Sequence, residues 1–174
     1  MSNWRISSFS GALLAAYFIP NWAIIAYTIV MSPVRGLYER PSVSVALYAT
    51  DHLQLASMTT VRFAWLLGLG RMTVVAFFAL FLVLTVISFV RKQSSGSEAL
   101  AIALCIGSVI SFASMIMASK VGEAEALRLH ATELLMMLGT GIVMLFDSPA
   151  QPQTVAATVP SDLPLQETQL SYNG

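Results

Sequence analysis

The chain has 174 residues, of which 56% are apolar and only 10% are charged. Soluble domains carry about 25% charged residues, so the composition excludes an ordinary water-soluble globular protein. Nine Lys or Arg residues balance nine Asp or Glu residues, so no basic field is available to bind nucleic acid through its phosphates. The single cysteine cannot form an internal disulfide or a cysteine-ligated metal site.

Four long apolar stretches predict four membrane-spanning helices, because a helix needs about 20 mostly apolar residues to cross a hydrocarbon core of about 30 Å. The expected spans cover about residues 11–31, 66–90, 99–119 and 126–146, within one transmembrane domain of residues 1–146. We therefore expect an all-α integral membrane protein, folded as an antiparallel bundle of four transmembrane helices. Residues 147–174 are rich in proline and polar side chains and are predicted to form a disordered tail.

The second span raises a question of length. Apolar residues begin at Phe63, so a single helix over residues 59–90 overshoots the bilayer and must tilt, protrude or break. Gly68 and Gly70 are the natural place for a bend. We favour the interpretation that Arg71 marks the start of the apolar part that follows it. In a continuous helix Arg71 instead lies in the hydrocarbon, where it costs about 3 kcal/mol or more and needs a partner such as Glu133.

Small residues follow one face of the third span at spacings of three and four. They are Ala99, Ala103, Gly107, Ser111, Ser114 and Ala118. Such a stripe lets another helix approach closely, and close packing with a few hydrogen bonds drives helix association in a bilayer. The stripe packs either the chain's own helices, which we favour, or a helix of another protein. Asn21, next to Pro20 in the middle of the first span, also points toward a partner helix.

Two histidines are the candidate cofactor ligands. His130 and Glu133 lie three residues apart and share a helix face near the start of the fourth span, close to Arg128. His52 lies in the long loop that four spans place on the same side of the membrane. His52 and His130 can therefore be read as axial ligands of a haem b. We favour an ordinary role, in which His130 bonds Glu133 or lies among headgroups and His52 is a loop residue. Arg71, Arg128 and Glu133 are expected to be intramembrane or interfacial polar residues.

Basic residues favour one orientation. The long loop and the start of the fourth span carry most of them, which indicates that this side is cytoplasmic, although Arg91 and Lys92 argue the other way. The expected location is the cytoplasmic (inner) membrane of a bacterium, because the sequence has no organelle-targeting composition.

No motif for phosphate binding or for serine hydrolase chemistry is present, so we expect no catalytic activity of the chain's own and no cofactor. The expected function is a non-catalytic accessory or structural subunit of a larger membrane complex, which docks on other transmembrane subunits through small-residue helix faces. One alternative is a haem- or quinone-binding anchor subunit of a redox enzyme. Another is a small oligomeric channel or transporter that uses Arg71, Glu133 and Asn21.

Overall fold

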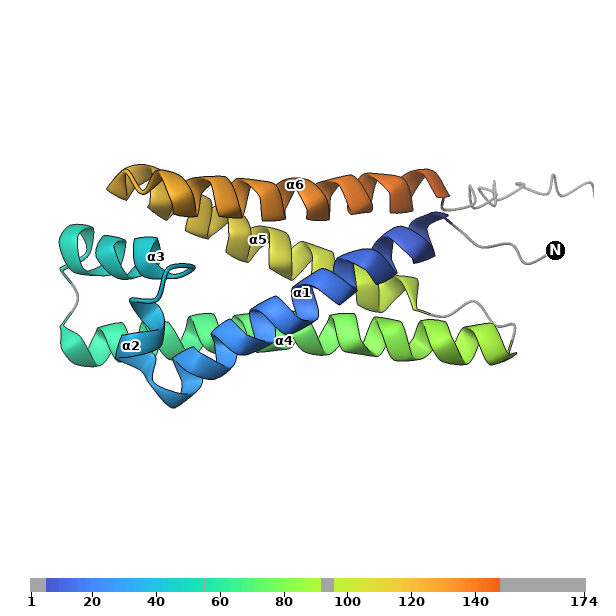
Figure 1. The fold of residues 1–174 in the computed structure, drawn as a ribbon, viewed down its shortest axis with the longest axis horizontal. Coiled ribbons are helices and arrows are strands. Elements are labelled where there is room, and N and C mark those ends of the chain that lie inside the picture. Colours follow the sequence, from blue (N-terminus) through green and yellow to red (C-terminus); the bar gives the residue numbers. More distant parts are fainter. Residues whose placement is uncertain (1–5, 55, 92–95, 148–174) are drawn as a thin grey trace, which may run out of the picture.

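The computed structural model describes residues 6–54, 56–91 and 96–147, and nearly all of these are helical (Figure 1). The long helices are α1 (Ile6–Met31), α4 (Ser57–Arg91), α5 (Ser97–Val121) and α6 (Ala124–Asp147). The short helices between α1 and α4 are α2 (Pro33–Leu37), α3 (Val43–Leu47) and the π-helix η1 (Tyr48–His52). No strand occurs in these ranges.

The prediction of an all-helical chain with four apolar helices is confirmed. Each of the four long helices is long and apolar enough to cross a membrane, and each contains one of the predicted spans. Apart from Asp147, which ends α6, the predicted tail of residues 147–174 lies outside the described residues.

α4 is one continuous helix of 35 residues, which corresponds to a length of about 50 Å. It passes through Gly68 and Gly70 without the break that the sequence suggested (Figure 1). The two glycines instead let neighbouring helices come close. A β-carbon on Gly68 would lie 3.2 Å from Ile29 Cγ2, and one on Gly70 would lie 3.2 Å from Ile110 Cδ1. Arg71 is therefore an internal residue of a long helix.

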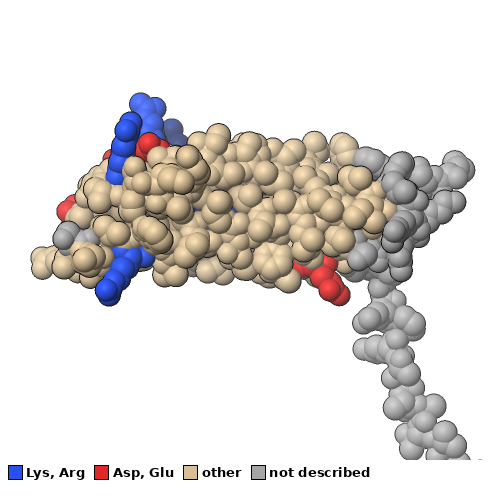
Figure 2. Space-filling model, turned by 90° about the horizontal axis from the view of Figure 1, so that it is seen from below, with Lys and Arg blue, Asp and Glu red and all other residues tan. Residues whose placement is uncertain are grey.

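Charge divides the molecule along its length. α1 and α5 end, and α4 and α6 begin, at the end where α2 and α3 lie (Figure 1). Every exposed Lys or Arg whose side chain the structure describes gathers there, so we name it the cation-rich end (Figure 2). These residues are Arg35, Arg40, Arg62, Lys120 and Arg128. Between this end and acidic side chains near the opposite end, the surface in Figure 2 is a broad band of uncharged side chains, which is compatible with a membrane location.

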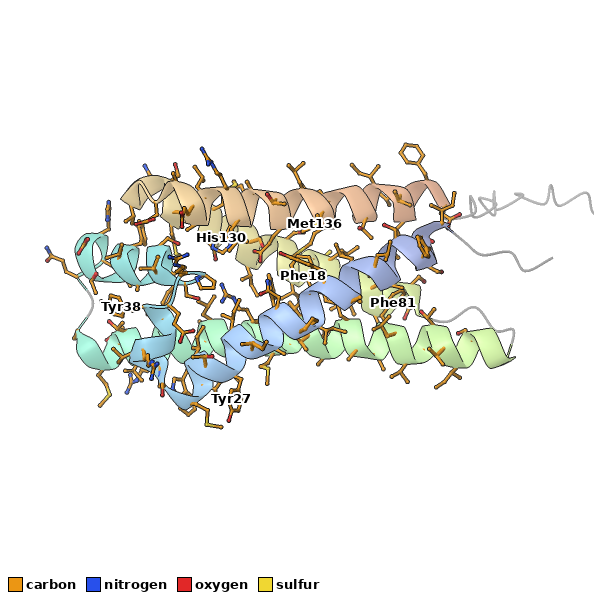
Figure 3. All side chains as sticks on the ribbon, in the orientation of Figure 1. Phe18, Tyr27, Tyr38, Phe81, His130 and Met136 are labelled. Carbon is orange, nitrogen blue, oxygen red and sulfur yellow. The ribbon has the colours of Figure 1, made fainter. Side chains whose placement is uncertain are left out.

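The main core lies between the four long helices. Phe18 of α1 stacks on Phe78 of α4 with 5.8 Å between ring centroids, and Figure 3 shows Phe18 among the helices while Tyr27 points away from them. The small-residue stripe of α5 faces this interior, because all six of its members are buried. A β-carbon on Gly107 would lie only 2.7 Å from Met137 Sδ of α6. The stripe therefore packs the chain's own helices.

Residues 32–54, which we call the inserted segment, are packed into the cation-rich end. Leu37, Val45 and Ala46 of this segment are buried in an apolar cluster with Ile29 of α1 and Ala64 of α4. We expected a long loop here. The structure instead folds the segment into short helices, because its apolar side chains complete the space between α1 and α4.

The close approach of α2 to α1 yields a stability prediction. A β-carbon on Gly36 would lie 2.7 Å from the backbone of Ile29, and backbone cannot move aside as a flexible side chain can. We expect Gly36→Ala to cost about 1–3 kcal/mol through overpacking and to lower the Tm measured by circular dichroism in detergent.

Gly139→Ala is the matched control. A β-carbon at Gly139 would meet nothing within 4 Å, and alanine is favoured over glycine in a helix by about 1 kcal/mol. The Tm of this variant should equal or exceed that of the parent. Equal Tm values for the two variants would contradict the packing of α2 against α1.

Candidate functional site

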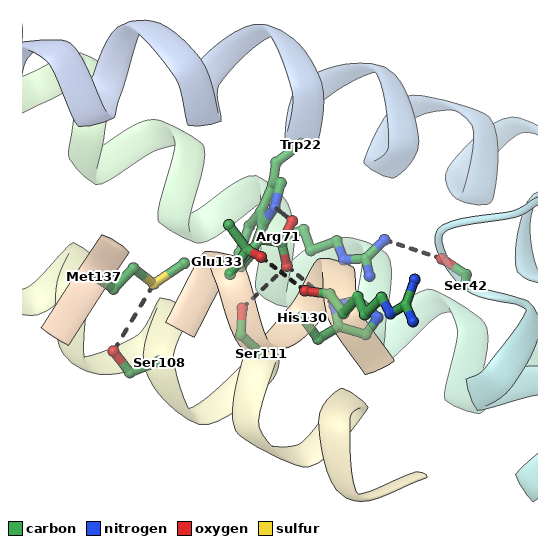
Figure 4. A network of polar contacts seen from close by, with 10 residues as sticks. Trp22, Ser42, Arg71, Ser108, Ser111, His130, Glu133 and Met137 are labelled. Atoms are coloured by element: carbon green, nitrogen blue, oxygen red, sulfur yellow. Dashed lines mark hydrogen bonds and ion pairs between the residues drawn. The ribbon is translucent and has the colours of Figure 1, made fainter. Parts of the chain in front are cut away.

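A cluster of buried polar side chains joins the long helices well inside the cation-rich end (Figure 4). Arg71 lies nine residues after Arg62 on α4, and Ser111 lies nine residues before Lys120 on α5. At 1.5 Å per residue, these separations correspond to about 14 Å along α4 and α5, whereas Glu133 lies five residues, about 8 Å, after Arg128 on α6.

Glu133 of α6 lies at the centre of the cluster. Trp22 Nε1 of α1 donates to Oε1 over 3.0 Å, and Ser111 Oγ of α5 donates to Oε2 over 3.3 Å. His130 Nδ1 lies 3.0 Å from Oε2. Only 2% of Glu133 is exposed, so one carboxylate links three helices within the interior.

The helical repeat of α6 explains how these groups come together. Ala126, His130, Glu133, Met137 and Thr140 are the buried residues of α6, and their spacings of three and four place them on one face. The spacing of His130 and Glu133 in the sequence predicts the contact that the structure shows. The same face carries apolar Met137 into the main core, so the polar cluster adjoins a dry region.

Arg71 of α4 lies next to this carboxylate. Its Nη1 donates to Ser42 Oγ of the inserted segment over 3.0 Å, and its Cζ lies 5.7 Å from the centroid of the Trp22 ring, within the range of a cation–π interaction. Its charge also attracts that of Glu133. Arg71 is only 2% exposed. The interpretation that it merely marks the end of a span is therefore wrong, because α4 continues on both sides of it.

Three buried polar atoms of this region have no hydrogen-bond partner among the described residues. They are Arg71 Nε, His130 Nε2 and Ser44 Oγ. When Glu133 is a carboxylate, His130 donates through Nδ1–H, and in the neutral ring Nε2 carries a lone pair with no donor beside it. Unsatisfied polar atoms in an interior are uncommon and require an explanation.

The structure does not bring the two histidines together. His52 is exposed, and its ring stacks on Tyr48 with 4.9 Å between centroids, whereas His130 is buried beside Glu133. The pair therefore does not form the facing ligands that the haem interpretation requires. Within residues 6–54, 56–91 and 96–147, no group of three or more His, Cys, Asp or Glu side chains is placed to hold a metal ion.

The remaining predicted polar residues lie outside the cluster. Arg128 is exposed at the cation-rich end, as expected for an interfacial residue. Asn21 is half-buried on α1, and its side chain has no hydrogen bond to any described residue.

Sequence reasoning did not identify Trp22 and Ser42 as members of the cluster. Trp22 carried a usable signal, because a tryptophan away from the ends of an apolar helix needs an acceptor for its N–H. Ser42 carried none, since its contact with Arg71 depends on the folding of the inserted segment.

The cluster can do two things chemically. Its charges and hydrogen bonds tie α1, α4, α5 and α6 together. His130 also places inside the bundle a ring nitrogen that has no hydrogen-bond partner among the described residues.

The coupling of Arg71 and Glu133 yields a second prediction. Removing one charge leaves the other buried and uncompensated, so Arg71→Leu and Glu133→Leu should each cost about 3–5 kcal/mol. The double variant should lose much less than the sum, because both charges are gone. The free energy of unfolding in detergent is measured for all three variants. Glu125→Gln, at an exposed position of α6, is the control and should be as stable as the parent. Additive losses would contradict the coupling.

No protein-family model matches the chain, and neither a curated protein nor a solved structure matches it.

Proposed function

We propose that the chain is a non-catalytic accessory subunit of a larger membrane protein complex, inserted as an antiparallel bundle of four spanning helices. The positive-inside rule assigns the cation-rich end to the cytoplasm. The membrane proposed is the cytoplasmic membrane of a bacterium. Partner subunits, in this proposal, dock on the outer face of α1.

The observation that carries the proposal is a group of polar atoms on the outside of α1, near its middle. Tyr17 is 43% exposed, and Asn21 lies one turn further along. Neither the Tyr17 hydroxyl nor the Asn21 amide forms a hydrogen bond with any described residue. Pro20 has no N–H to donate to the carbonyl of Ala16. In hydrocarbon each of these groups is costly unless another helix supplies a partner.

The shape of this face also suits a second helix. Ala16 and Pro20 are small and exposed and lie between larger side chains, so a partner backbone can approach closely. The stripe on α5 cannot serve in this way, because its residues are buried in the bundle. The proposed occupant is therefore a transmembrane helix of another subunit that carries hydrogen-bonding side chains toward Tyr17 and Asn21.

A channel or transporter is a second candidate, because ionisable residues inside a membrane span often mark a pathway. Arg71 and Glu133 are such residues. Against a pathway through one copy of the chain, the apolar core that includes Phe18, Phe78 and Met137 fills the bundle next to them.

Site-directed photocross-linking in native membranes tests the docking proposal. A photoreactive residue at Ile24, which is 68% exposed on α1, should form a cross-link to a different membrane polypeptide. Asn21→Leu should weaken that association by about 3- to 30-fold, which corresponds to the loss of one interhelical hydrogen bond. The same variant should shift the complex to a smaller size on a native gel.

The control carries the photoreactive residue at Val86, which is 65% exposed on α4 and should react only with lipid. Cross-links from Ile24 only to lipid, or only to a second copy of this chain, would refute the accessory-subunit proposal. A cross-link that Asn21→Leu leaves unchanged would refute the assigned face.

A further inference from the structure

The docking face of α1 does not use the buried cluster around Glu133, which calls for a separate explanation. Two of its own atoms, Arg71 Nε of α4 and His130 Nε2 of α6, are unsatisfied, and so is Ser44 Oγ of α3, two residues beyond the Ser42 that contacts Arg71. A cluster that served only to fasten helices would be expected to satisfy its buried donors and acceptors. Polar buried groups of this kind are commonly completed by water.

The surroundings of the cluster differ in its two directions along the bundle. Toward the opposite end the interior is apolar: the main core continues from Trp22 to Leu14 on α1 and from Val74 to Phe81 on α4. Such a region excludes water and ions. Approach to the cluster from that end is therefore closed.

Toward the cation-rich end the cluster meets the inserted segment. Ser42 of this segment contacts Arg71, and Ser44 is fully buried with an unpaired hydroxyl. The chain between α2 and α3 is not helical, and non-helical backbone at membrane depth is tolerated where protein buries it or where it lines a water-filled cavity. The two serine hydroxyls are thus the buried polar groups that the inserted segment contributes on this side of the cluster.

We propose that His130, held by Glu133, is a proton-binding site that water reaches from the cation-rich end past Ser42 and Ser44, and that the apolar core closes it from the other side. The ligand is the hydrated proton. One O–H bond of hydronium breaks, an N–H bond forms at His130 Nε2, and the neutral imidazole becomes an imidazolium ion. No oxidant, reductant or further reactant is needed.

The charged groups of the cluster determine what this proton does. Glu133 on the same helix carries the one negative charge, and Arg71 on α4 carries a positive charge. The other contacts to Glu133 from α1 and α5 are the neutral groups of Trp22 and Ser111. Uptake of a proton therefore changes the cluster from neutral to a net charge of +1 at a point where three helices meet.

Trp22 fluorescence reports the event directly, because its indole shares Glu133 with His130 and an imidazolium ion nearby quenches indole emission. The chain has three tryptophans, so Trp4→Phe with Trp65→Phe leaves Trp22 alone. In proteoliposomes, we expect acidification to lower emission only when it is applied on the side of the cation-rich end.

The chain has two histidines, so one can be replaced as the test and the other as its matched control. His130→Gln should abolish the response, whereas exposed His52→Gln should keep it. A response to acid on the opposite side, no response on either side, or a response that survives His130→Gln would each overturn the proposal. Insertion direction is measured with a membrane-impermeant thiol reagent on Lys120→Cys in a Cys105→Ser background.

A second measurement does not depend on changing His130. In the same Cys105→Ser background, Ser44→Cys should react with a small membrane-impermeant thiol reagent added on the side of the cation-rich end. Ala103→Cys, which replaces an equally buried residue of the main core, should remain unreactive. An unreactive Ser44→Cys, or equal reaction at both positions, would contradict access by water. Neither outcome bears on the docking face of α1, so the two proposals fail independently.

Discussion

The structure depends on the burial of one carboxylate. Glu133 binds Trp22, Ser111 and His130 at once and attracts the charge of Arg71, so it draws together elements that are otherwise apolar on nearly every side. In lipid, apolar side chains gain little by leaving the bilayer for the bundle interior, and polar contacts with close packing decide how helices pair. The cost of a charged group in hydrocarbon makes this pairing specific, because another register would leave Arg71 or Glu133 without its partner.

The packing of the rest of the bundle is consistent with this anchor. Gly107 lets Met137 approach α5, and Gly68 does the same for Ile29 at the crossing of α1 and α4. These close contacts lie on either side of the cluster along the bundle. The opposite charges of Arg71 and Glu133 determine which side chains pair. The small residues let the helix backbones approach closely enough for the hydrogen bonds of Glu133 to form.

Much of the fold could be predicted from the sequence, because a long charge-free stretch has few alternatives to a spanning helix. The stripe on α5 was also predictable, since a spacing of three and four fixes one face whatever lies opposite. The continuity of α4 was not, because Gly68 and Gly70 permit either a bend or a close contact. The inserted segment was missed for a similar reason: the stretch from Val43 to Leu47, apolar apart from Ser44, is too short to be distinguished from a loop by its pattern.

The site could be predicted only in part. The i, i+3 spacing of His130 and Glu133 showed that the two side chains share a face, but the partners of Glu133 come from residues 22, 71 and 111, and Arg71 in turn contacts Ser42. Such contacts depend on tertiary arrangement, which spacing within one helix cannot give. The sequence analysis did identify Glu133 as a partner for Arg71, because a buried charge needs an opposite charge nearby. Charge balance can thus predict a contact between two helices, whereas periodicity only predicts which residues of one helix share a face.

Nitrogen NMR of labelled histidine in lipid bilayers tests the central claim most directly, with His52→Gln leaving His130 as the one labelled ring. We predict that Nδ1 is protonated and correlates with the Glu133 carboxyl group. An unprotonated Nδ1, or no correlation between the imidazole and Glu133, would contradict the account.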